Sequence, residues 1–88
     1  MFYYVYILVS EKDGKKYTGF TKNLRLRFKR HQQGLVQSTK DRRPFKLIYY
    51  EACLNEKDAV HREKYFKTYN GCRFISKRLK SYLTGQGK

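Results

Sequence analysis

Alternation of apolar and polar stretches predicts an antiparallel hairpin at the start of the chain. Residues 3–9 are aromatic or aliphatic throughout, a composition typical of a buried strand. Asp13-Gly14 follows as a hairpin turn signal, and residues 15–20 supply the return strand. Gly19 inside that strand indicates close approach of another backbone or a ligand.

The next segment predicts a helix followed by a polar loop. Asn23 is a favourable capping residue for a helix over residues 24–33, and Gly34 is placed to end it. Residues 35–45 are rich in Ser, Thr, Lys and Arg and are expected to form a loop.

The second half predicts one more strand and two helices. Residues 45–53 contain a β-branched and aromatic run typical of a strand. Asn55 caps the following helix, and Gly71 marks a break before a last helix over about residues 73–83. The order strand-strand-helix-strand-helix-helix predicts a small α/β sandwich with helices packed on a three-stranded, mostly antiparallel sheet.

The length of 88 residues suffices for one domain, which we expect over residues 1–83 with a flexible tail at 84–88. No apolar run is long enough to span a membrane. The first residues do not resemble a signal peptide, so a cytoplasmic location is expected. Cys53 and Cys72 are neither paired closely enough for a metal site nor numerous enough for a disulfide scaffold.

Charge narrows the choice of partner. Lys and Arg total 21 against seven acidic residues, a formal net charge of +14. A small folded domain with this balance binds a polyanion. Nucleic acid is the leading candidate, and an anionic membrane or an acidic protein is the alternative.

Four short pieces of sequence then form a recognisable series. Tyr4-Val5-Tyr6 opens the first predicted strand, and Tyr17-Thr18-Gly19 lies in the second. Arg27 and His31 share the first helix, and Glu63 lies on the second. In order and spacing this series resembles the GIY-YIG nuclease superfamily, above all its small stand-alone members that are similar to the nuclease domain of excinuclease C.

The resemblance covers nearly the whole chain, with some departures. The first motif has Tyr4 where the family has glycine, and the middle residues of the two motifs are Val5 and Thr18. Both motif tyrosines are kept. A downstream asparagine that some members use has Asn70 as its nearest counterpart.

The resemblance implies a metal-dependent endonuclease that hydrolyses phosphodiester bonds in DNA, in DNA repair or in processing of structured DNA. Glu63 would hold one Mg²⁺ or Mn²⁺, which typically uses one or two carboxylates. Arg27 would neutralise the scissile phosphate. Tyr6 would act as the general base, for which its pKa must fall from about 10. Tyr17 and His31 would orient water or relay a proton, His31 because histidine titrates near neutral pH.

Geometry expected from the residues alone supports part of this set. If the turn centres on Asp13-Gly14, residues whose numbers sum to about 27 face each other, and Tyr6 and Tyr17 come close. Arg27 and His31 are four apart on one helix face. Glu63 falls on the apolar face of its helix, although an ordinary surface pair with Lys67 is the alternative.

Further basic and polar residues are candidate nucleic-acid contacts, which position a phosphate backbone without reading its sequence. They are Lys22, Arg25, Lys29, Ser38, Thr39, Lys40, Arg42 and Arg43.

Two other functions remain open. One is a binding module of the same fold that is catalytically weak or depends on a protein partner for its activity. The other is a basic RNA-binding accessory protein. DNA is the expected substrate, with RNA as an alternative, and the expected state is a monomer or weak homodimer.

Overall fold

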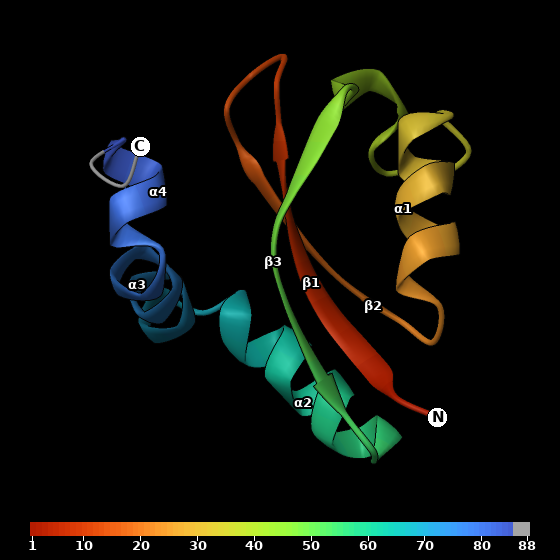
Figure 1. Cartoon of the computed structure of the whole chain (residues 1–88), viewed down its shortest axis with the longest axis vertical. Coiled ribbons are helices and arrows are strands. Elements are labelled where there is room, and N and C mark those ends of the chain that lie inside the picture. Colours follow the sequence, from red (N-terminus) through yellow and green to blue (C-terminus); the bar gives the residue numbers. More distant parts are fainter. Residues whose placement is uncertain (86–88) are drawn as a thin grey trace.

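A three-stranded antiparallel sheet forms the centre of the molecule (Figure 1). The structure is a computed structural model that describes residues 1–85. The strands are β1 (Tyr3–Ser10), β2 (Lys16–Thr21) and β3 (Phe45–Cys53), in the spatial order β2-β1-β3. The predicted α/β class and antiparallel sheet are therefore confirmed.

The register of the hairpin differs from the expected one by two residues. Tyr6 pairs with Gly19 rather than with residue 21, and Leu8 pairs with Tyr17. The reason is the loop, which spans residues 11–14 and is closed by a hydrogen bond from the Ser10 amide to the Lys15 carbonyl at 2.9 Å. Because residues two apart share a face, Tyr6 and Tyr17 still lie on the same side of the sheet.

Helices cover both faces of the sheet (Figure 1). On one face lies α1 (Leu24–Gln32), where the Asn23 side chain accepts a hydrogen bond from the Leu26 amide as predicted. On the other lies α2 (Glu56–Phe66), capped by Asn55. The loop after α1 contains one short 3₁₀ helix, η1 (Lys40–Arg42).

The C-terminal helices correct one prediction. Gly71 does not break the chain between helices but lies buried in the first turn of α3 (Tyr69–Arg78), which Thr68 caps. A short α4 (Lys80–Thr84) follows. Of the expected flexible tail, Thr84 ends α4 and Gly85 caps it, and residues 86–88 lie outside the described part of the chain.

The sheet separates two apolar clusters because alternate residues of β1 point to opposite faces. Val5 and Ile7 pack with Ala59, Phe66 and Ile75 of α2 and α3. On the α1 face, Tyr6 and Leu8 pack with Phe45. The α1 cluster therefore carries a phenol in its buried centre, where an aliphatic side chain would serve packing equally well.

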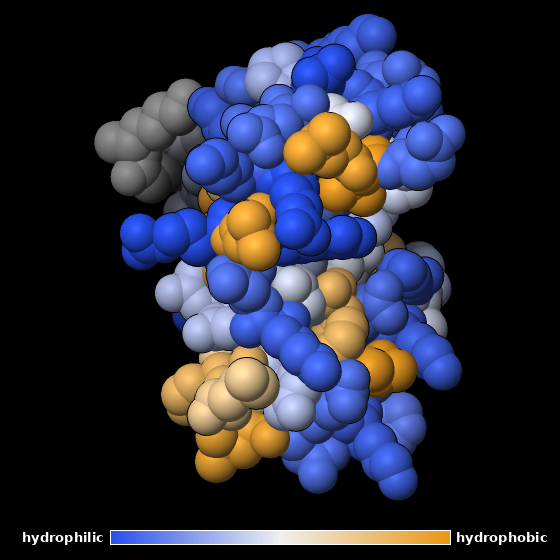
Figure 2. Space-filling view, turned by 90° about the vertical axis from the view of Figure 1, so that its right-hand side faces the viewer, coloured by the Kyte–Doolittle hydropathy of each residue, from blue (hydrophilic) through white to orange (hydrophobic). Residues whose placement is uncertain are grey.

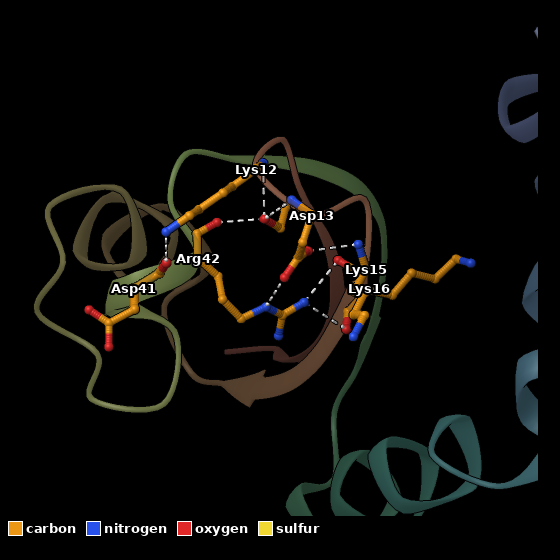
Figure 3. A network of polar contacts seen from close by, with 7 residues as sticks. Lys12, Asp13, Lys15, Lys16, Asp41 and Arg42 are labelled. Atoms are coloured by element: carbon orange, nitrogen blue, oxygen red, sulfur yellow. Dashed lines mark hydrogen bonds and ion pairs between the residues drawn. The ribbon is translucent and has the colours of Figure 1, made fainter.

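A polar network fastens the hairpin loop to η1 (Figure 3). The Arg42 guanidinium bonds Asp13 at 3.1 Å and the Lys15 carbonyl at 3.0 Å. The Ser10 hydroxyl donates to the Arg42 carbonyl at 2.6 Å. These bonds fix the segment that follows α1 against the end of the hairpin.

Within residues 1–85, no helix has the length and apolar character needed to cross a membrane.

Candidate active site

Tyr6 stands at the centre of the candidate site. Its side chain is fully buried on the α1 face of β1, and its hydroxyl lies 2.8 Å from His31 Nε2. The ring extends over Gly19 of the neighbouring strand, where an added Cβ would overlap the Tyr6 hydroxyl and Cζ. The group that approaches Gly19 closely, as the sequence predicted, is thus the Tyr6 ring. Any residue other than glycine at position 19 would place a Cβ in the space that this ring occupies.

His31 connects Tyr6 to the loop after α1. Its Nδ1 lies 2.8 Å from the Thr39 hydroxyl, which itself donates to the Val36 carbonyl at 3.5 Å. The Thr39 oxygen is then the acceptor for Nδ1–H, and Nε2 accepts from the Tyr6 hydroxyl. This arrangement gives every hydrogen in the chain an acceptor.

Burial sets the protonation of both rings. Desolvation, helped by the charge of Arg27, lowers the pKa of His31 to about 4, so the imidazole is neutral at physiological pH. Burial also raises the pKa of Tyr6 above its usual 10, while the Arg27 guanidinium acts in the opposite direction. The sequence predicted that His31 titrates near neutral pH and that the pKa of Tyr6 is lowered. In the structure the pKa of His31 is lowered and that of Tyr6 is raised.

Arg27 lies one helical turn before His31 and carries an unmet hydrogen-bonding group. Its Nε is buried without a partner, the only such side-chain nitrogen or oxygen within the described residues. A buried donor without an acceptor is costly, by about 1–3 kcal/mol. Arg27 also borders a surface groove with Lys22, Asn23 and Arg30. The Arg27 side chain therefore lies between the Tyr6 phenol and a solvent-facing groove, with an Nε that makes no hydrogen bond within the described residues.

Tyr17 completes an aromatic group around the histidine. Its ring centroid lies 5.2 Å from that of His31 and 6.4 Å from that of Tyr6. The structure therefore brings together four of the five residues expected to be catalytic, all on the α1 face.

Glu63 lies on α2, the helix on the face of the sheet opposite α1. Its side chain is 19 % exposed, and its negative charge is a minor influence that raises the pKa of Tyr6, after burial and the charges of Tyr17 and Arg27. It also pairs with Lys67 at 2.7 Å, the surface arrangement considered as its alternative. The pair with Lys67 is therefore present, and a role of Glu63 in the site stays a prediction.

The donor set at Glu63 fits a hydrated divalent cation. No group of three or more His, Cys, Asp or Glu side chains in residues 1–85 is arranged to hold a metal. Mg²⁺ does not require one, since it keeps several waters and uses one or two carboxylates plus substrate phosphate. A partly exposed single carboxylate meets that need, although a cation there competes with Lys67.

The candidate nucleic-acid contacts divide into two groups. Six have exposed side chains: Lys22, Arg25, Lys29, Ser38, Lys40 and Arg43. Figure 2 shows that hydrophilic residues cover most of the α1 side of the molecule, with small separate apolar patches. Thr39 is a correction, because it is fully buried against His31 and cannot touch a phosphate. The Arg42 guanidinium donates its hydrogen bonds to Asp13 and to backbone carbonyls.

Comparison with known proteins decides the family. The model of the GIY-YIG catalytic domain matches residues 2–72, which include all five candidate catalytic residues. This chain belongs to the GIY-YIG family.

Its relatives include several small GIY-YIG proteins. A UPF0213 protein of Clostridium perfringens is 46 % identical over 65 residues, which are 73 % of this chain and 69 % of that protein. One of Limosilactobacillus reuteri is 44 % identical over 68 residues, 74 % and 70 % of the two chains. The solution structure of a UPF0213 protein of Bacillus halodurans aligns with a TM-score of 0.54 at 32 % identity, covering 88 % of this chain and 84 % of that one. Family membership indicates a nuclease-type domain.

The sequence did not predict one contact of the candidate site, the one between Thr39 and His31. Thr39 was expected at the surface, and the structure places it behind His31. The residue lies in an irregular segment with no periodicity that could show its direction, so the sequence carries no signal for this contact.

Proposed function

We propose that this chain is a divalent-metal-dependent endonuclease that hydrolyses phosphodiester bonds in DNA. The observation that carries the proposal is the Arg27 guanidinium, which lies beside the Tyr6 phenol, borders a solvent-facing groove and has an Nε without a partner within the described residues. A phosphate oxygen is a strong acceptor for a guanidinium and forms charge-assisted hydrogen bonds with it. The formal charge of +14 draws a polyanion to this surface.

Arg27 is the residue that holds the phosphate. Its planar fork donates to two oxygens at once and places positive charge where the transition state is most negative. Exposed Lys22 and Arg25 at the start of α1 would hold neighbouring phosphates.

Tyr6 and His31 handle the proton of the attacking water. Burial disfavours a free phenolate at Tyr6, because its pKa is raised. In the proposed step the hydroxyl accepts a proton from water as it passes its own to His31 Nε2, so the charge ends on the imidazole and no phenolate forms. Because burial and Arg27 hold the pKa of His31 to about 4, the anionic phosphate must stabilise that imidazolium. Thr39 is a positioning residue, since its bond to Nδ1 keeps the Nε2 lone pair directed at Tyr6. Tyr17 packs against the imidazole and limits its rotation.

Glu63 is the residue that would hold Mg²⁺ or Mn²⁺. The bound cation supplies charge neutralisation and Lewis acidity for the phosphoryl group.

The test is cleavage of labelled single-stranded, duplex and branched DNA in Mg²⁺ or Mn²⁺. We expect Arg27→Ala to lower kcat by about 10²–10³-fold, the usual effect of removing one transition-state donor. Arg27→Lys should recover only part of this because it keeps the charge and loses the fork. Glu63→Gln should abolish cleavage, and Glu56→Gln, an exposed acid on the same helix, should leave it unchanged.

A wild-type protein that cuts none of these substrates, or cleavage that survives Glu63→Gln, would overturn the proposal. The first result favours the second candidate, a nucleic-acid-binding module without turnover. The observation in its favour is the Lys67 ammonium 2.7 Å from Glu63, where a cation would sit. Salt-dependent binding without cleavage would identify it.

A further inference from the structure

A second groove of about 470 Å³ adjoins the candidate active site and is lined by none of the five candidate catalytic residues. Its walls are largely apolar and aromatic, formed by Tyr4, Leu24, Phe28, Leu47 and Tyr50. Tyr50 is 53 % exposed, although burial of a tyrosine ring against such neighbours would be favourable. The groove therefore presents an aromatic surface to solvent.

The sheet places this groove directly beside Tyr6. Tyr4 precedes Tyr6 by two residues on β1 and so shares its face. Tyr50 of β3 is the cross-strand partner of Tyr6. The rings of Tyr4 and Tyr50 meet edge to face, with centroids 6.0 Å apart. The contact with Tyr4 thus holds the Tyr50 ring in a fixed orientation, on the strand beside Tyr6.

Charge continues from the phosphate site to this groove. Lys22 and Asn23 line both the tyrosine groove and the groove of Arg27, so the two are neighbours across the start of α1. Arg25 lies at the tyrosine groove as well. A nucleic-acid backbone that runs from Arg27 past Lys22 would therefore enter the tyrosine groove.

We propose that the tyrosine groove is a subsite for one unstacked nucleobase, and that the substrate is therefore single-stranded or locally unpaired nucleic acid. The inference rests on the proposed function, because it takes the phosphate at Arg27 as the starting point of the strand. A base fits this groove because its flat apolar face stacks on tyrosine while the cations Lys22 and Arg25 hold the adjoining phosphates. A paired base cannot enter, since its face is covered by its neighbours in the duplex.

The test measures binding in the presence of EDTA, so that turnover plays no part. The probes are a fluorescent single-stranded oligonucleotide and the duplex of the same sequence. Stacking on an aromatic side chain contributes about 1–3 kcal/mol per base, so Tyr50→Ala should weaken single-strand binding by about 5- to 150-fold and duplex binding by less than about twofold. Tyr50→Phe should bind like the wild type. Tyr82→Ala, which removes a tyrosine of similar exposure (51 %) on α4, is the control and should change neither.

A second variant reports stacking directly. The chain has no tryptophan, so Tyr50→Trp introduces a single indole whose fluorescence should be quenched by the single strand and not by the duplex. Equal losses on single strand and duplex with Tyr50→Ala, or unquenched indole, would overturn the base subsite while leaving the nuclease proposal standing. Failure of the wild type to bind either probe would overturn both. Cleavage lost through Glu63→Gln with binding intact would show that the two proposals are separate.

Discussion

At the scale of single residues, the candidate site depends on a line of three side chains. Tyr6 bonds His31, and His31 bonds Thr39, with 2.8 Å at each step. Each of the three is fully buried. Burial is what keeps the imidazole neutral and the phenol protonated, so the geometry and the protonation have the same origin.

Gly19→Ala tests the closeness of Tyr6 to its neighbouring strand. The new methyl group would overlap the Tyr6 hydroxyl, so the ring must shift and its hydrogen bond to His31 is disturbed. We expect cleavage to fall by at least about 100-fold, the effect of misplacing a catalytic group by roughly 1 Å. The measurement is kcat together with the tyrosine hydroxyl resonance of Tyr6 in NMR spectra. Thr18→Ala in the same strand is the control, and equal activity of the two variants would contradict this role of Gly19.

The sequence indicated most of these candidate residues but neither their protonation nor their burial. Tyr6, Tyr17, Arg27, His31 and Glu63 came from the resemblance to the GIY-YIG superfamily, and Gly19 from its place in a strand. The pKa of His31 could not be predicted, because it depends on burial by residues from β3 and the 35–45 loop that are distant in sequence. For the same reason Thr39 was assigned to solvent.

At the scale of elements, strands and helix starts were predicted well because their signals are local. Asn23 and Asn55 cap the helices as expected, and β3 has the predicted bounds. The last predicted helix had the wrong bounds: one helix over about residues 73–83 was expected, and the structure has α3 (Tyr69–Arg78) and α4 (Lys80–Thr84). Gly71 looks the same in sequence whether it ends a helix or permits a contact. Here it permits a contact between α3 and the end of α2.

Gly71→Ala measures that contact. Alanine has a helix propensity better than glycine by about 1 kcal/mol, which alone would stabilise α3. Its methyl group, however, would overlap the backbone carbonyl of Tyr65, which cannot move aside as a side chain could. Overpacking of this kind costs about 1–3 kcal/mol or more, so we expect a net loss of about 2 kcal/mol in the free energy of unfolding in urea. Ser76→Ala, exposed on the same helix, should change it by less than about 0.5 kcal/mol; a stabilised Gly71→Ala protein would contradict the expectation.

At the scale of the whole molecule, stability should depend on pH through His31. Its pKa is about 4 when folded and about 6.5 when unfolded. The unfolded chain binds the proton first as pH falls, so the stability present above about pH 6.5 is lost progressively down to about pH 4. Since one pKa unit corresponds to about 1.4 kcal/mol, the full effect is about 3 kcal/mol.

Urea unfolding from pH 7.5 to 4 checks this dependence. His31→Gln should flatten the decline, because glutamine does not titrate. His61→Gln, which removes an exposed histidine, should keep the slope of the wild type. Parallel curves for the wild type and His31→Gln would show that other groups cause the decline.

Through the network of Ser10, Asp13 and Arg42, the hairpin loop affects residues that it does not touch. Exposed hairpin loops ordinarily accept inserted peptides and tags, because few contacts depend on them. Here the loop holds η1 through Arg42, and Thr39 immediately before η1 holds His31. An epitope grafted between residues 11 and 14 would therefore disturb the Tyr6 hydroxyl at the opposite end of this chain of contacts. Anyone engineering this small domain should treat that loop as part of the catalytic scaffold.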